Sequence, residues 1–324
     1  MQGLVTVFGG SGFIGTQVTR ALAKQGYRVR VAVRRPGLGY KLPLMGDVGQ
    51  IEVVQANLRN PASIGRALDG AEGCINLVGV LYESGRQGFD GLHATGAEEI
   101  AAACAARAIA RMVQVSAIGA DANSASKYAR TKAEGEAAVL KRLPQASIVR
   151  PSVVFGVDDD FFNRFAAMAS ISPILPLPGG GGTRFQPVFV GDAAAAIVAA
   201  LREPSAAGKT FEIGGPDIYT YRQLMELMLA EIHKTRILAP LPWGLARLIG
   251  LVGDLQAKLL PIAPPLTSDQ VELLRHDNVT APSLPGLKAL GVSAPVAVEA
   301  IIPTYLYRYR RGGQFAPEPA ATGA

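Results

Sequence analysis

The chain has 324 residues, of which 49% are hydrophobic and 18% charged, and its formal net charge is +6. This length and composition exclude a mainly disordered protein and allow one large α/β domain or two smaller lobes. The basic charge fits an anionic partner, whether a dinucleotide, an acidic protein surface or lipid headgroups. Charge alone does not choose among these three.

Membrane spans and disulfides are not expected. No run of about 18 apolar residues lacks a charge, so any association with a membrane is expected to be peripheral. The run at residues 4–8 is already typical of a buried strand, which leaves no room for a signal or transit peptide. Cys74 and Cys104 are the only cysteines. They are too few for a disulfide scaffold and lack metal-ligand spacing, so we expect a reducing compartment and no metal site.

In the first half of the chain, short apolar runs alternate with helical patterns. They predict strands near residues 4–8, 28–33, 51–55, 73–79, 111–116 and 146–150. Because strand–helix alternation is typical of parallel sheets, the sequence predicts an α/β fold with a doubly wound Rossmann sheet. The dinucleotide-binding domain is expected at 1–150, with part of 185–215 returning to it.

The second half is richer in proline and glycine, with helices predicted near 191–202 and 220–233. It predicts a smaller C-terminal α/β lobe at 151–311 and a disordered tail at 312–324. The stretch from Trp243 to Leu260 is amphipathic, and two interpretations stay open. It is either an interfacial helix at a lipid headgroup boundary or part of the core of the smaller lobe.

A glycine-rich turn follows the first predicted strand and leads directly into a predicted helix. Its sequence is Gly9-Gly10-Ser11-Gly12-Phe13-Ile14-Gly15. Gly9 permits a sharp turn, Gly12 lets the backbone approach a pyrophosphate, and Gly15 lets the helix pack closely on the strand. Because free N–H groups and the helix dipole favour an anion there, the turn predicts a dinucleotide site.

The end of the second strand predicts which dinucleotide binds. Sites that choose NAD usually carry an acidic residue there, which accepts the ribose hydroxyls. Arg34 and Arg35 occupy this place, and guanidinium groups suit a 2′-phosphate, so we predict NADPH. The alternative is a solvated basic turn. By position, Asn57 is expected near the adenine and Leu77-Val78-Gly79 beside the middle of the cofactor.

Further motifs follow the later strands. They are Ser116 at the end of the fifth strand, Tyr128-Ala129-Arg130-Thr131-Lys132, Arg150-Pro151 after the sixth strand and Pro187-Val188-Phe189-Val190-Gly191-Asp192. With the glycine turn they resemble the extended short-chain dehydrogenase/reductase family across nearly the whole chain. The resemblance implies that Tyr128 is a general acid or base, that Lys132 lowers its pKa and binds the nicotinamide ribose, and that a serine orients the substrate carbonyl. It places Ser116, Tyr128, Lys132 and Pro151 at the cofactor.

The serine environment departs from the family pattern. After Ser116 comes Ala117-Ile118-Gly119-Ala120, where active members generally have a further hydroxyl residue that carries the substrate role. Without it, a carbonyl loses a polarising donor worth on the order of 3 kcal/mol in the barrier. We therefore expect cofactor binding to survive, whereas Tyr128, Lys132 and Ser116 are catalytic only if the protein is active.

Residues 5–15, 115–120, 126–136 and 149–165 carry a closer resemblance. Within the family they resemble the dehydrogenase-like accessory subunits of respiratory complex I and their bacterial relatives. This resemblance implies a non-catalytic NADPH-binding subunit that supports assembly or stability of the peripheral arm. It implies other complex I subunits and lipid headgroups as partners, no nucleic acid, and a place on the cytoplasmic face of a bacterial inner membrane. The alternative hypothesis is an active NADPH-dependent reductase or epimerase that uses Tyr128 and Lys132.

Other polar residues are interpreted as structural. His93, His233 and His276 lie in different predicted elements and are expected to be structural or solvated. Asp192 is expected to be the N-cap of a helix. The acidic run at 158–160 is expected to cap a helix or meet a partner, and the basic-aromatic run at 305–311 to contact a partner or a membrane or to be an exposed helix end.

Overall fold

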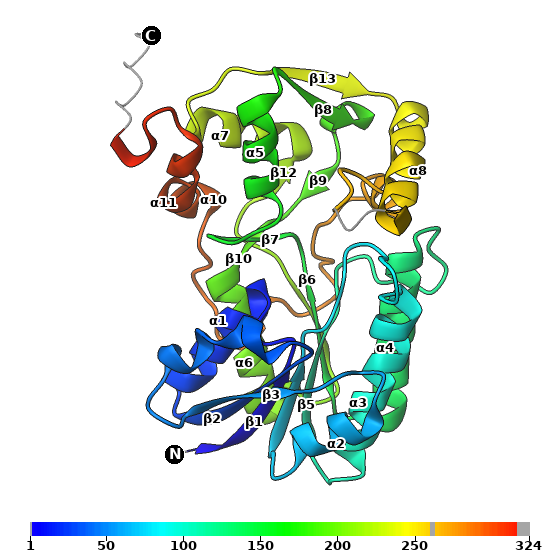
Figure 1. Ribbon diagram of the computed structural model, residues 1–324, viewed down its shortest axis with the longest axis vertical. Coiled ribbons are helices and arrows are strands. Elements are labelled where there is room, and N and C mark those ends of the chain that lie inside the picture. The colour runs from blue at the N-terminus through cyan, green and yellow to red at the C-terminus, as the bar shows by residue number, and fades with distance from the viewer. Residues whose placement is uncertain (1, 260–262, 316–324) are drawn as a thin grey trace.

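Seven parallel strands form the central sheet of the computed structural model, which describes residues 2–259 and 263–315 (Figure 1). In spatial order they are β11 (Thr210–Ile213), β6 (Ser147–Pro151), β5 (Arg111–Val115), β4 (Gly73–Asn76), β1 (Gln2–Phe8), β2 (Tyr27–Val33) and β3 (Ile51–Gln55). The order reverses between β1 and β4, and ligands of such sheets bind at the carboxyl ends of the strands near this point.

Helices cover both faces of the sheet. On one face α1 (Phe13–Lys24) packs against α6 (Val190–Arg202), and the other face carries α2 (Pro61–Leu68), α3 (Thr95–Ala105) and α4 (Lys127–Arg142). Strands buried on both faces are almost continuously apolar, which explains their valine- and isoleucine-rich runs. The predicted doubly wound α/β fold is confirmed.

Two predicted element boundaries in this lobe are wrong. β4 ends at Asn76 and not at residue 79, because the side-chain oxygen of Asn76 accepts the N–H of Val78 at 3.1 Å and turns the chain out of the strand. Helix α6 begins at Val190, so Asp192 is not its N-cap. Asp192 lies in the first turn, and its carboxylate accepts the N–H of Val296 at 2.7 Å.

The smaller lobe lies above the carboxyl ends of the strands (Figure 1). It contains the strand pairs β7 (Val154–Phe155) with β10 (Val188–Phe189), β8 (Ile174–Pro178) with β13 (Ile237–Leu241), and β9 (Arg184–Phe185) with β12 (Tyr219–Thr220). Its helices are α5 (Phe162–Ile171), α7 (Tyr221–Glu231), α8 (Trp243–Leu259), α9 (Ser268–Leu273), α10 (Val298–Ile301) and α11 (Pro303–Leu306). The domain boundaries near 150 and 311 stay a prediction.

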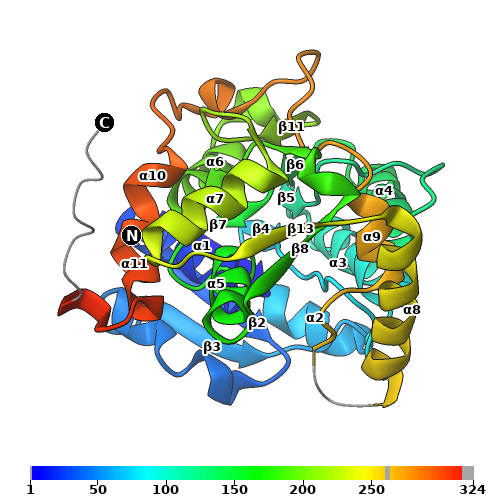
Figure 2. The ribbon, with the colours of Figure 1, turned by 90° about the horizontal axis from the view of Figure 1, so that it is seen from above.

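Helix α8 lies along the outer edge of the molecule, on the side opposite α10 and α11 (Figure 2). Its buried residues are small, namely Ala246, Gly250, Gly253 and Ala257. Trp243 is half-buried, whereas the other large apolar side chains are exposed, namely Leu245, Leu248, Ile249, Leu251, Val252, Leu255 and Leu259. The interpretation of this stretch as lobe core is therefore wrong for these exposed residues, and Leu260 lies outside the described residues.

The acidic run at 158–160 and the basic-aromatic run at 305–311 meet in the smaller lobe. Buried Asp159 accepts the N–H of Asn163, as a helix-capping carboxylate does, and the hydroxyl of Tyr305 at 2.5 Å. Arg310 forms an ion pair with Glu231 of α7. Part of this end therefore packs inward. Residues 313–315 form a short 3-10 turn, and the rest of the predicted disordered tail, 316–324, lies outside the described residues.

Candidate dinucleotide site

The glycine turn adopts the shape that a phosphate site requires. Gly9 has a φ of +78°, a left-handed conformation that favours glycine. A Cβ on Gly15 would collide with the carbonyl oxygen of Gly9 and lie 2.6 Å from the Cα of Gly10. Gly12 is the N-cap of α1 and provides no side chain to cap it. The first N–H groups of α1 thus remain available to an anion.

The other predicted cofactor residues lie along the carboxyl edge of the sheet and differ in exposure and hydrogen bonding. Arg34 and Arg35 are exposed after β2, and neither guanidinium has a side-chain partner among the described residues. A Cβ on Gly9 would lie 3.2 Å from the backbone of Leu77 and Val78, so the first and fourth strand ends meet. The side-chain oxygen of Asn57 accepts the N–H of Arg59 at 3.1 Å and is engaged in its own turn.

Tyr128 and Lys132 share one face of α4, as their spacing predicts. The Lys132 ammonium lies 5.7 Å from the centre of the Tyr128 ring. Burial lowers the pKa of Lys132 to about 8, although the Glu136 carboxylate acts in the opposite direction. Burial, and secondly the charge of Asp269, raises the pKa of Tyr128 to about 12. At neutral pH the phenol therefore keeps its proton and is a hydrogen-bond donor.

Ser116 lies just beyond β5 and is 4% exposed. Its Oγ is buried and has no hydrogen-bond partner within the described part of the chain. An unsatisfied buried hydroxyl costs stability, so such an atom suggests a missing ligand or water. Pro151 ends β6 on the same edge of the sheet, and its carbonyl accepts the N–H of Ile118 at 3.0 Å.

His93, which the sequence assigned only a structural or solvated role, lies at the centre of this site. Its Nε2 accepts the N–H of Val80 at 3.1 Å, which leaves the proton on Nδ1, 3.2 Å from Thr131 Oγ1. The Thr131 hydroxyl donates to the carbonyl of Tyr128 at 3.1 Å. His93 thus joins the loop after β4 to α4. Only its position in the sequence could have indicated this role. His93 lies just before the helix that follows the fourth strand, and such a residue lies near the carboxyl end of that strand.

We expect acid to destabilise the protein through His93. Burial, with a contribution from the Lys132 charge, lowers the pKa of His93 from 6.5 to about 3. Below pH 6.5 the unfolded chain binds a proton that the folded protein rejects, so stability falls as pH falls from 6.5 towards 3. Between pH 6.5 and 5 the loss is about 2 kcal/mol.

Urea unfolding of the wild type and of His93→Gln at both pH values measures this effect. The variant lacks the titrating group but keeps an amide that can replace both hydrogen bonds. The difference in unfolding free energy between the two pH values should be about 2 kcal/mol smaller in the variant. Equal losses in the two proteins would contradict the assignment of a buried neutral His93.

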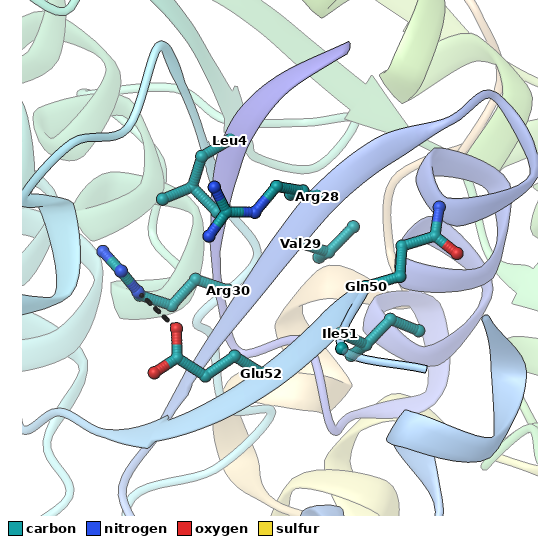
Figure 3. A pocket seen from close by; sticks show the side chains of 8 residues that line it. Leu4, Arg28, Val29, Arg30, Gln50, Ile51 and Glu52 are labelled. Carbon is teal, nitrogen blue, oxygen red and sulfur yellow. Dashed lines mark hydrogen bonds and ion pairs between the residues drawn. The ribbon is translucent and has the colours of Figure 1, made fainter. Parts of the chain in front are cut away.

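A pocket of about 550 Å³ lies at the opposite edge of the sheet, at the amino ends of β2 and β3 (Figure 3). Arg30 and Glu52 form an ion pair of 3.0 Å on its wall. None of the predicted site residues lines it, so it is separate from the dinucleotide site. Over residues 2–259 and 263–315, no group of three or more His, Cys, Asp or Glu side chains could hold a metal ion.

The residues at the carboxyl edge fit a dinucleotide. The turn is so tight that a Cβ on Gly15 would not fit, and no side chain caps the N-terminus of α1. The buried Oγ of Ser116 has no hydrogen-bond partner among the described residues. A Cβ on Gly79 would lie 3.1 Å from Lys132 Nζ, so the loop after β4 and the Tyr128–Lys132 helix form one wall. Contact of the individual residues with a cofactor stays a prediction.

Comparison with known proteins agrees with this geometry. Residues 5–214 match the model of the NAD dependent epimerase/dehydratase family. The chain is 36% identical over 321 residues to the Arabidopsis thaliana protein named NADH dehydrogenase [ubiquinone] 1 alpha subcomplex subunit 9, mitochondrial, covering 97% of this chain and 80% of that protein. It is also 36% identical over 225 residues to a ceramide reductase of Caulobacter vibrioides, covering 69% of each chain.

Solved structures show the same fold. The NADPH-dependent quinone oxidoreductase QOR2 of Escherichia coli, in complex with NADPH, superposes with a TM-score of 0.71 at 20% sequence identity. The alignment covers 91% of this chain and 97% of that structure.

Proposed function

The chain belongs to the NAD-dependent epimerase/dehydratase family, and from this premise we propose that it is a non-catalytic, NADPH-binding accessory subunit of respiratory complex I. The observation that carries the proposal is the 36% identity to the Arabidopsis subunit over 97% of this chain. In this role the protein supports assembly or stability of the peripheral arm, and other complex I subunits are its partners. Copurification with complex I from host membranes tests the proposal.

The cofactor in this proposal is NADPH and acts as a stability ligand. The turn at residues 9–15 and the start of α1 would hold the pyrophosphate, and Arg34 with Arg35 the 2′-phosphate. Lys132 would bind the nicotinamide ribose, with Tyr128 and Ser116 beside it as hydrogen-bond donors. A ligand that binds only the folded state stabilises that state, so a tightly bound dinucleotide would raise the free energy of unfolding of the sheet whose strand ends it contacts.

Replacement of both arginines is expected to remove the preference for NADPH. Hydrogen bonds to charged groups contribute about 1.5 to 3 kcal/mol each, so Arg34→Ser with Arg35→Ser should weaken NADPH binding by about 100-fold or more. NADH, which lacks the 2′-phosphate, should bind this variant as it binds the wild type. Calorimetric titration with both dinucleotides measures the ratio.

Arg28→Ser is the matched control, because Arg28 is an exposed arginine near the amino end of the same strand. It should leave both affinities unchanged. A double variant that still prefers NADPH as strongly as the wild type would mean that Arg34 and Arg35 form only a solvated basic turn.

We further propose a peripheral place on the cytoplasmic face of a bacterial inner membrane, with α8 against anionic lipid. No helix among the described residues is long and apolar enough to cross a bilayer. The exposed face of α8 combines leucine and valine side chains with Arg247 and Lys258, and its acidic residue, Asp254, is engaged by Ser268. Apolar side chains flanked by cations suit the boundary between acyl chains and anionic headgroups.

A second candidate function is an active NADPH-dependent reductase or epimerase. It is favoured by the Tyr128–Lys132 pair on α4 and by the identity to a protein named ceramide reductase. In that case Tyr128 would donate a proton to a carbonyl oxygen, while the bound nicotinamide supplies hydride chemistry. The pKa of Tyr128, raised to about 12, keeps the phenol protonated at neutral pH but makes it a weaker proton donor than a free tyrosine. The residues 117–120 offer no further hydroxyl.

A further inference from the structure

Asp269, in the first turn of α9, connects the smaller lobe to the N-terminus of α4. Its carboxylate accepts hydrogen bonds from Ser126 Oγ at 2.8 Å, from the N–H of Lys127 at 2.6 Å and from the N–H of Tyr128 at 3.2 Å. The first N–H groups of a helix have no partner within it, and the helix dipole favours a negative charge there. Asp269 therefore fixes the end of α4 that carries Tyr128.

The same segment is attached to α8. A Cβ on Gly250 would lie 2.7 Å from the nitrogen of Ser268, and one on Gly253 would collide with the carbonyl oxygen of Leu266, so α8 lies directly on this backbone. Asp254 of α8 accepts the N–H of Ser268 at 3.3 Å and also its hydroxyl. Ser268, bound by α8, is thus the immediate neighbour of Asp269, which holds α4.

Space remains around this connection. A pocket of about 210 Å³ opens between the lobes, with walls that include Glu83, Phe89 and Lys127 from one lobe and Asp254, Lys258 and Asp269 from the other. The Lys127 ammonium, unlike its backbone N–H, pairs with Glu83 at 3.0 Å and with Asp90 at 2.8 Å. The hydrogen bonds of Asp269 therefore join α9 to α4 beside an open pocket.

We propose that Asp269 is a positioning residue that links the exposed face of α8 to the Tyr128–Lys132 end of the dinucleotide site. A surface that holds α8 restrains Ser268 and Asp269, and through them α4. A dinucleotide held by Lys132 restrains α4 from the other side. Docking of α8 and cofactor binding therefore strengthen each other, by the same factor in both directions. This inference rests on the proposed docking of α8 against anionic lipid.

The test measures NADPH affinity of the full chain, from NADPH fluorescence, with and without vesicles of phosphatidylglycerol and phosphatidylcholine in equal amounts. For the wild type, vesicles should tighten NADPH binding by about 5-fold or more, and NADPH should tighten vesicle binding equally. Asp269→Asn removes the charge with little change in size. In this variant the ratio of NADPH affinities with and without vesicles should fall to nearly one. A merely structural role would change both affinities without removing their coupling.

Glu272→Gln is the control, because Glu272 is a carboxylate of the same helix that pairs with Arg275 at 3.6 Å. It should retain the wild-type factor. Hydrogen exchange on the wild type gives a second test that needs no substitution. Vesicles should slow exchange of the Lys127 and Tyr128 amides, which donate to Asp269.

Three results would overturn the inference: an Asp269→Asn variant with the wild-type factor, a wild type that binds vesicles without any change in NADPH affinity, or one that binds no vesicles. None of them concerns migration with complex I. Copurification without coupling would therefore refute the link alone, whereas coupling without copurification would refute the complex I role alone.

Discussion

Gly15→Ala is expected to weaken NADPH binding by about 10- to 100-fold and to destabilise the protein by about 1 to 3 kcal/mol. The atoms nearest to the added Cβ are all backbone, among them the Cα of Gly10 at 2.6 Å and its carbonyl carbon at 2.8 Å. Backbone cannot rotate away as a side chain does, so the turn itself must move. The N–H groups that would face the phosphates move with it. Fluorescence titration with NADPH and thermal unfolding measure the two effects.

Gly37→Ala provides the control for this substitution. A Cβ on Gly37 would meet nothing within 4 Å, and the residue lies in the same lobe, just after Pro36. Its affinity and stability should stay close to those of the wild type. If Gly15→Ala were folded and bound NADPH as tightly as Gly37→Ala, the glycine turn would not be the phosphate site.

Charged residues on α8 are expected to release the protein from membranes. Leu248, Val252 and Leu255 are 58%, 62% and 58% exposed, so their replacement by Asp should cost the folded protein little. Burial of each side chain against a lipid boundary contributes roughly 1 kcal/mol of binding free energy, so the triple variant should bind anionic vesicles about 100-fold more weakly. Vesicle cosedimentation measures the change.

Leu38→Asp with Leu44→Asp is the matched control, since these side chains are 71% and 84% exposed on the sheet lobe. This variant should bind vesicles like the wild type. Equal losses in the two variants would show that any exposed leucine contributes. Wild-type binding by the α8 variant would exclude α8 as the contact surface.

The local features of the fold could be predicted from the sequence because they repeat over a few residues. The apolar runs predict β2 and β3 to within one residue of their observed ends, and the glycine spacing predicts the turn between β1 and α1. Gly26, just after the end of α1, has a φ of +84°, a conformation that favours glycine. Periodicity and turn residues report on neighbours in the chain, and these elements depend on such neighbours.

Features that depend on distant residues were missed. Asp269 lies 141 positions from Tyr128, whose N–H it accepts, and His93 lies 38 positions from Thr131. No local pattern marks either contact. The amphipathic pattern of α8 could be seen in the sequence, but which face is buried could not. Small residues also occur on exposed faces, and in α8 they form the buried face. The inward face became clear only when Gly250 and Gly253 were seen against the backbone of residues 266–268.

The most direct test of the complex I role is to solubilise host membranes in mild detergent, separate them by native electrophoresis and locate this chain by mass spectrometry. We expect migration together with complex I subunits, and the same migration for a Tyr128→Phe variant, since no proton transfer is required. A small free species that oxidises NADPH in the presence of a carbonyl compound, and loses that activity with Tyr128→Phe, would contradict the complex I role and support the reductase.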